Sequence, residues 1–111
     1  TDFAKQYGDK FEMTRDPMVA AKSADVVITD VWASMGQEEE KAIREAVFKS
    51  FKIDDQLMSV AKQDAMVLHC LPAHREEEIS ADVFEAHAKE IFEEAENRLH
   101  AQKAVMVKLM S

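Results

Sequence analysis

The chain has 111 residues, 47% of them hydrophobic, and a formal net charge of −8. This length suits one small domain with a hydrophobic core, residues 1–111, and the negative charge argues against nucleic acid or an anionic membrane as the main partner. No apolar run approaches the ~20 residues of a membrane span. A single cysteine cannot form an internal disulfide, which favours a reducing, cytoplasmic setting.

The apolar and capping patterns predict alternating strands and helices. In chain order we expect a strand at 11–14, a helix at 17–23, a strand at 25–29, helices at 34–49 and 56–62, a strand at 66–68, a helix at 80–89, an extended link at 91–92 and a helix at 94–109. Asp16, Ser34, Asp54 and Ser80 are the helix N-caps expected from their positions. The alternation indicates an α/β fold in three layers, with helices packed on a parallel sheet.

Two polar residues follow the central predicted strands. Asp30 comes directly after the strand at 25–29, and Cys70 comes at or just past the end of the strand at 66–68, before Pro72. In an open α/β sheet, ligands bind outside the carboxyl ends of the strands, so both residues are candidates for a site. Each also has a plain structural interpretation, with Asp30 as a loop cap and Cys70 as a small buried hydrophobe.

Other polar residues near these strand ends have a structural explanation. Ser34 caps a helix, and the glutamates at 38–40 complement the dipole of its first turn. His69, Cys70 and His74 form a cluster, but adjacent residues on a strand point to opposite faces. Apart from His69 and His74 themselves, the spacing lacks the paired pattern of zinc sites. We therefore expect no metal and no cofactor.

Three motifs resemble those of the ornithine carbamoyltransferases. They are DVWASMG at 30–36, HCLPAHR at 69–75 and ENRLHAQKA at 96–104. The similarity runs through essentially the whole chain and is to the C-terminal, ornithine-binding part of the enzyme, an incomplete doubly wound, Rossmann-like domain. The chain begins with threonine, and nothing in it matches the family's S-x-R-T or H-P-x-Q motifs, so we expect a piece of a larger enzyme.

The resemblance implies an activity and an ornithine site. The family transfers a carbamoyl group from carbamoyl phosphate to the side-chain amine of L-ornithine, giving L-citrulline and phosphate. By the family motif, Asp30 holds the amino-acid ammonium group, and Ser34 and Met35 contact ornithine. Asp30 and Cys70 together are the expected catalytic pair, because the amine must lose a proton before it attacks the carbamoyl carbon.

The resemblance also implies a carbamoyl phosphate site. Cys70 and Leu71 of HCLP lie against the carbamoyl group and the reacting amine in the family. Arg98, which we expect in the N-terminal turn of the last helix, reaches carbamoyl phosphate and stabilises negative charge as phosphate leaves. One departure concerns the loop between them. Glu76 stands where the family usually has glycine, so the loop is expected to change shape if that position needs a positive φ.

The expected partners follow from the same resemblance. They are L-ornithine, carbamoyl phosphate, the remainder of the enzyme or a second chain, and further copies in a trimer-based homo-oligomer, with no nucleic acid or membrane. We expect the chain to be inactive without the missing carbamoyl phosphate domain. The alternative is a non-catalytic amino-acid-binding or regulatory module derived from a transcarbamylase. Arg98 favours the enzyme, because a mere binder of the amino acid does not need a phosphate-directed residue.

Overall fold

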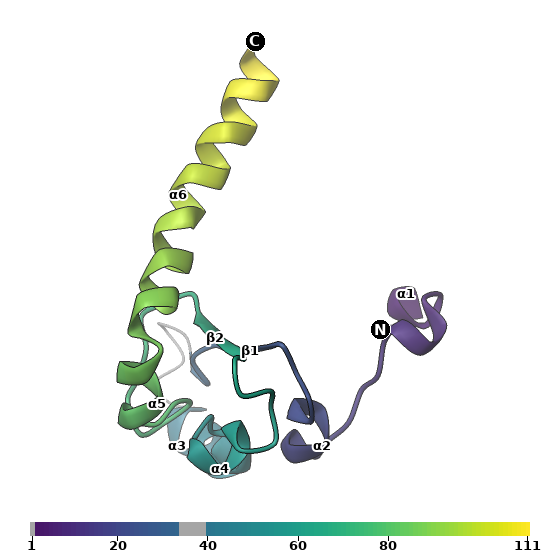
Figure 1. Cartoon of the computed structure of the whole chain (residues 1–111), viewed down its shortest axis with the longest axis vertical. Helices are drawn as coiled ribbons and strands as arrows, with labels where there is room; N and C mark the ends of the chain where they lie inside the picture. Colours follow the sequence, from purple (N-terminus) through teal and green to yellow (C-terminus); the bar gives the residue numbers. More distant parts are fainter. Residues whose placement is uncertain (1, 34–39) are drawn as a thin grey trace.

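The computed structural model of the chain describes residues 2–33 and 40–111. Its centre is a two-stranded parallel sheet made of β1 (Val26–Thr29) and β2 (Met66–His69). The register pairs Val26 with Met66 and continues to the last pair, Thr29 with His69. Figure 1 shows the two strands side by side, with helices around them. The α/β fold predicted from the sequence is therefore confirmed.

Helices and short 3-10 turns account for most of the remaining described residues. They are α1 (Asp2–Lys5), η1 (Gly8–Lys10), α2 (Pro17–Ala21), α3 (Lys41–Phe48), η3 (Lys49–Phe51), α4 (Asp55–Met58), α5 (Ala81–Ala86) and α6 (Ala88–Met110). Three of the four predicted N-caps are confirmed, because the side chains of Asp16, Asp54 and Ser80 accept backbone N–H groups of α2, α4 and α5. The fourth, Ser34, lies outside the described residues.

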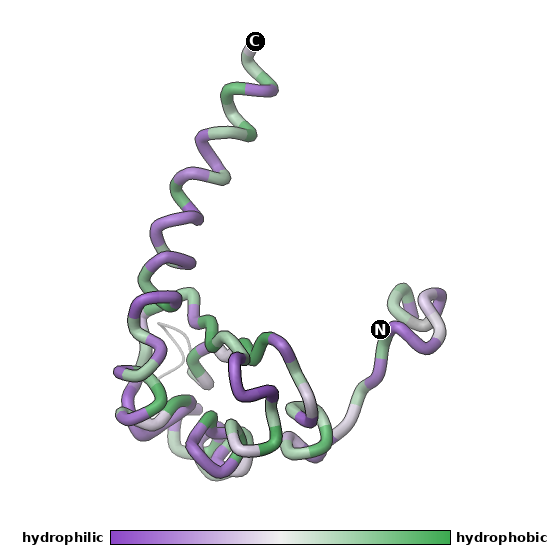
Figure 2. The backbone as a smooth tube through the Cα atoms, viewed as in Figure 1, coloured by the Kyte–Doolittle hydropathy of each residue, from purple (hydrophilic) through white to green (hydrophobic). Residues whose placement is uncertain are grey.

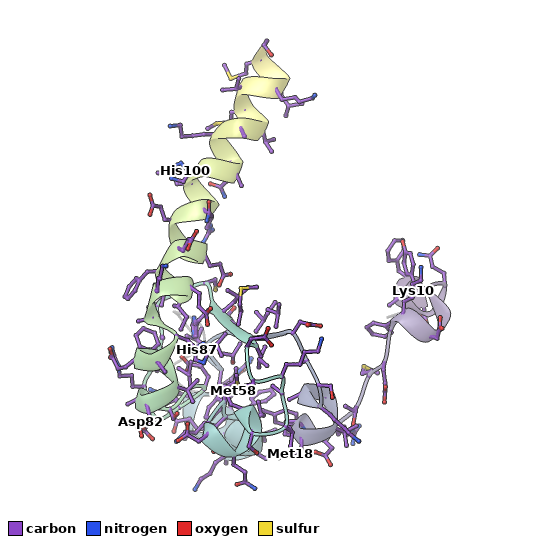
Figure 3. All side chains as sticks on the ribbon, in the orientation of Figure 1. Lys10, Met18, Met58, Asp82, His87 and His100 are labelled. Carbon is purple, nitrogen blue, oxygen red and sulfur yellow. The ribbon has the colours of Figure 1, made fainter. Side chains whose placement is uncertain are left out.

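The hydrophobic core lies on one face of β2. Val67 and His69 are fully buried, whereas Met66, which points to the opposite face, is 45% exposed. The core also contains Ile79, Phe84 and Ile91 from the loop before α5, from α5 itself and from α6. Met18 and Met58 pack at its edge, where α2 meets α4 (Figure 3). The opposite face of the sheet stays open, with Ile28 68% exposed.

Two of the predicted extended segments do not occur. Residues 11–14 do not form a strand, because within the described chain no strand lies beside them to accept their backbone hydrogen bonds. The extended link at 91–92 does not exist either, since α6 begins at Ala88 and includes both residues. Ala88, Ile91 and Ala95 recur at helical spacing and turn inward, with Ile91 wholly buried. Helical periodicity there outweighs the β propensity of an Ile-Phe pair.

The second half of α6 leaves the body of the molecule. Every residue from 96 to 111 is exposed, and Figure 1 shows the helix projecting beyond the sheet. Hydrophobic residues recur along this projection, as the green segments of Figure 2 show, and the large exposed ones include Leu99, Val105 and Leu109. Within the described residues, no helix combines the length and apolarity needed to cross a bilayer, the 23-residue α6 included.

We predict that Ile91→Ala lowers the free energy of unfolding by about 2–5 kcal/mol, because it leaves a cavity in the core. The helix itself tolerates alanine well, so the loss measures packing rather than helix propensity. Val105→Ala is the matched control, since Val105 is 58% exposed on the same helix and surface changes stay within about 0.5 kcal/mol. Urea unfolding followed by circular dichroism gives both values. Equal effects would contradict the buried, helical placement of Ile91.

Candidate active site

The parallel register brings Asp30 and Cys70 together. Thr29 of β1 pairs with His69 of β2. The residues that follow them, Asp30 and Cys70, are therefore neighbours at the ends of two strands about 4.8 Å apart. Side chains alternate between faces along a strand. Thr29 and His69 turn toward the core, and Asp30 and Cys70 therefore turn to the opposite face, where both are exposed. The sequence predicted this convergence at one edge of the sheet, and the structure confirms it.

The two side chains form a hydrogen bond. The Cys70 thiol donates to Asp30 Oδ1 at 3.4 Å, and the same oxygen accepts the N–H of Val31 at 2.8 Å. The pKa of the Cys70 thiol is raised, chiefly by partial removal of the thiol from water, then by its hydrogen bond to Asp30 and by the negative charges of Asp30 and Glu94. A thiolate beside these carboxylates is disfavoured, so Cys70 is a protonated hydrogen-bond donor at neutral pH.

The loop after Cys70 is held by a buried pair that the sequence interpretation missed. His69 and Glu78 are both fully buried, and His69 Nε2 lies 2.9 Å from Glu78 Oε1. On its other side, His69 Nδ1 accepts the N–H of Leu71 at 3.0 Å. The signal available in the sequence was a histidine on the inward face of an apolar strand, which needs a polar partner when buried.

Glu76 occupies the position where the family usually has glycine, and it adopts the positive φ that glycine would favour. Its φ is 70°, in the left-handed region that glycine adopts most easily. The glutamate side chain makes contacts that glycine lacks, because its carboxylate accepts Lys52 Nζ at 2.7 Å and the N–H of Ala81 at 2.8 Å. These two bonds lower the pKa of Glu76 and tie the loop to the start of α5.

Helix α6 runs along the free edge of β2 toward the site. Glu90 Oε1 accepts the N–H of Val67 at 2.9 Å, and one turn later the charge of Glu94 acts on Cys70. Arg98 lies a further turn along the same helix face, about 6 Å beyond Glu94. The helix therefore carries Arg98 past the end of β2, where it is exposed. Its expected place in the N-terminal turn is wrong, because α6 begins ten residues earlier.

The hollow beside β1 does not include both Asp30 and Cys70 in its lining. A hollow of about 510 Å³ runs along β1 and reaches Asp30, Trp32 and Phe51. Cys70 is absent from its lining among the described residues. Asp30 therefore lines this hollow, whereas Cys70 does not. Ser34 and Met35, the two other predicted ornithine contacts, lie outside the described residues.

Metal binding at the strand ends conflicts with the hydrogen bonds. One ligand atom each from Asp30, His69 and Cys70 lies within 4.8 Å of the others. Both nitrogens of His69 are already engaged, one by Glu78 and the other by the Leu71 N–H. A metal ligand needs a free nitrogen lone pair, which this arrangement does not leave.

His87, the N-cap of α6, and His100, within α6, each contact a glutamate of the same helix rather than Asp30 or Cys70. His87 contacts Glu90, and His100 Nε2 lies 3.2 Å from Glu96 Oε1. Figure 3 shows His87 at the start of α6 and His100 farther along its projecting part. Both residues therefore have the surface or packing roles that their helical positions predicted.

The raised thiol pKa leads to a measurable pH dependence. Because Asp30 disfavours the thiolate, Asp30→Asn should lower the pH midpoint of Cys70 alkylation by iodoacetamide and raise its rate at neutral pH. Glu94→Gln should shift the midpoint in the same direction. Glu93→Gln, an exposed neighbour on the same helix, is the control and should leave it unchanged. An unchanged midpoint in Asp30→Asn would show that the two side chains are not in contact.

Comparisons with known proteins agree with this geometry. A family model described as aspartate/ornithine carbamoyltransferase, Asp/Orn binding domain, matches residues 1–109. The ornithine carbamoyltransferase of a Nitratiruptor species is 62% identical over 105 residues, 95% of this chain and 34% of that protein. That of Geobacter metallireducens is 55% identical over 106 residues, 96% of this chain and 35% of that protein.

Solved structures give the same relationship. The anabolic ornithine carbamoyltransferase from Campylobacter jejuni matches with a TM-score of 0.89 and 49% identity, over 97% of this chain and 36% of that one. The enzyme from Pyrococcus furiosus matches with a TM-score of 0.81 and 50% identity, over 95% and 34%. The chain thus spans about a third of the length of its relatives. It belongs to the aspartate/ornithine carbamoyltransferase family, and residues 1–109 correspond to the amino-acid-binding domain of that family.

Proposed function

We propose that this chain is the amino-acid-binding part of an ornithine carbamoyltransferase, which transfers the carbamoyl group of carbamoyl phosphate to L-ornithine. The observation that carries the proposal is the contact between Asp30 and Cys70 at 3.4 Å, on the exposed face where two parallel strands end. A carboxylate there offers the negative partner that a substrate ammonium group needs. The 62% identity to a protein named as this enzyme supports the choice of substrate.

The chemistry assigned to the pair is binding and deprotonation of the amine. Asp30 binds the side-chain ammonium of ornithine and accepts its proton, which frees the nitrogen lone pair. The Cys70 thiol stays protonated because its pKa is raised, so it orients the Asp30 carboxylate without competing for the proton. The nitrogen then attacks the carbamoyl carbon. A C–N bond forms and the bond from that carbon to the phosphate oxygen breaks. The departing phosphate takes the second proton of the attacking nitrogen, which leaves the neutral amide of citrulline.

Arg98 and Leu71 are assigned to the carbamoyl phosphate side of the site. The guanidinium of Arg98 stabilises the negative charge of the phosphate as it leaves. Leu71 has a φ of 57°, which turns the chain sharply directly after Cys70, where the family places the carbamoyl group. Ser34 and Met35 complete the proposed contacts to ornithine. No cofactor takes part in this scheme.

The open apolar surfaces support a need for further protein. The outward face of the sheet exposes Val26 and Ile28, and the projecting part of α6 exposes Leu99, Val105 and Leu109. Large apolar side chains exposed in such number favour an interface with further protein. We assign them to the remainder of the carbamoyltransferase, which also supplies the main phosphate contacts. A cytoplasmic enzyme assembled from trimers completes the proposal.

A chimeric enzyme tests this function. Replacing the matched 105 residues of the Nitratiruptor enzyme by this chain should give a protein that makes citrulline from ornithine and carbamoyl phosphate. The isolated 111 residues should make none, because Arg98 alone cannot position a dianionic donor. A chimera that folds and binds carbamoyl phosphate but makes no citrulline would contradict the proposal and favour a non-catalytic module. Turnover by the isolated chain would contradict the proposal that the remainder of the enzyme supplies the main contacts to carbamoyl phosphate.

The same chimera separates the two substrates. Asp30→Asn removes the proposed partner of the ammonium group and should raise the KM for ornithine at least about tenfold, with little change in the KM for carbamoyl phosphate. Asp25→Asn serves as the control, because Asp25 forms a surface ion pair with Lys62 at the other end of β1. Equal losses for both substrates would reduce Asp30 to a structural residue.

A further inference from the structure

A chain of hydrogen bonds surrounds the segment that carries Cys70. It begins at the Leu71 N–H, which donates to His69 Nδ1 at 3.0 Å, and continues from His69 Nε2 to Glu78 Oε1 at 2.9 Å. The same Glu78 oxygen accepts the N–H of His74 at 2.6 Å. The three bonds therefore connect the last residue of β2 with both sides of the loop that follows Cys70.

The partners fix the tautomer of His69. The Leu71 backbone amide can only donate, so Nδ1 must be the acceptor nitrogen of the ring. The proton then sits on Nε2, which donates to the carboxylate of Glu78. The imidazole thus bridges one donor and one acceptor, and its orientation is defined from both sides. Neither nitrogen is left for water, since the ring is fully buried.

Packing alone does not account for this pair. Both residues are fully buried, and Glu78 Oε2 has no hydrogen-bond partner within the described part of the chain, lying 3.8 Å from His74 Nδ1. Burying a carboxylate with one unsatisfied oxygen is costly, and an apolar pair of similar volume is often as stable or more so. What an apolar pair cannot supply is the acceptors for the amides of Leu71 and His74.

These amides belong to the turn that sets the direction of the Cys70 side chain. Leu71 has a φ of 57°, which a residue with a side chain adopts only when its surroundings hold it there. Its N–H donates the hydrogen bond that His69 Nδ1 accepts. A change in the backbone at Leu71 would move Cys70 Sγ, which is the atom in contact with Asp30.

We propose that His69 and Glu78 are positioning residues that hold the Cys70–Leu71 backbone, so that the Cys70 thiol meets the Asp30 carboxylate. They act through hydrogen bonds and touch neither substrate. The consequence for catalysis rests on the proposed function, but the geometry of the thiol does not. The active part of Glu78 in this role is one accepting oxygen rather than its negative charge.

Four variants of the isolated chain separate the hydrogen bonds made by the side chains of His69 and Glu78. Glu78→Gln keeps an accepting oxygen, whereas Glu78→Leu removes it. His69→Asn keeps an acceptor close to the Leu71 N–H, whereas His69→Gln keeps a donor toward Glu78. The readouts are the pH midpoint of Cys70 alkylation and the imidazole ¹⁵N chemical shifts of His69, with circular dichroism to establish that each variant is folded.

In Glu78→Leu we expect the alkylation midpoint to fall toward that of a free thiol, about 8.5, because the thiol loses its contact with Asp30. Glu78→Gln should restore the original midpoint. In the unmodified chain, the ¹⁵N shifts of His69 should report a protonated Nε2 and an unprotonated Nδ1. Both His69 variants should shift the pH midpoint of Cys70 alkylation, since each keeps only one of the two hydrogen bonds that the imidazole makes.

Three results would overturn the proposal. One is a folded Glu78→Leu chain with an unchanged midpoint, which would leave Glu78 a purely structural role. Another is Glu78→Gln behaving like Glu78→Leu, which would make the charge essential. The third is the opposite tautomer in the unmodified chain, and this test stands even if every variant fails to fold. In the chimera, Glu78→Gln should retain kcat while Glu78→Leu loses it, and an inactive unmodified chimera would refute the proposed function without touching these results.

Discussion

The parallel register of β1 and β2 is the constraint on which the site depends. Because Thr29 pairs with His69, the next residues must emerge side by side on one face, and the face follows from the alternation of the strands. A slip of one residue would turn either Asp30 or Cys70 into the core. The fully buried Val67 and His69 oppose such a slip, since it would expose both of them. The hydrophobic pattern of β2 thus fixes the geometry of the polar pair beyond it.

The sequence predicted what depends on neighbouring residues in the chain. Asp16, Asp54 and Ser80 cap helices because each side chain reaches N–H groups only two or three residues away. The convergence of Asp30 and Cys70 was also predictable, because parallel strands place all their carboxyl ends at one edge. The Glu76 position shows the limit of motif comparison. Glu76 adopts a left-handed conformation although it is not glycine, and its contacts to Lys52 and Ala81 stabilise that conformation.

What the sequence did not predict depends on contacts between distant residues. The helical state of Ile91 follows from its burial against β2, which the local Ile-Phe pair does not reveal. Glu78 stands in a run of three glutamates, REEE, in which nothing distinguishes the buried member from its exposed neighbour Glu76. Only the three-dimensional loop brings it to His69. Arg98 was assigned from its motif, but its place three turns into α6 depends on where that helix begins.

The central claim is that Asp30 and Cys70 act on one amine as a pair. A double-mutant cycle in the chimera tests it directly, with Asp30→Asn, Cys70→Ala and the double variant compared by the dissociation constant of L-ornithine. Residues in contact at a shared ligand should show a coupling free energy of about 0.5–3 kcal/mol. Additive losses, with no coupling beyond experimental error, would contradict the account.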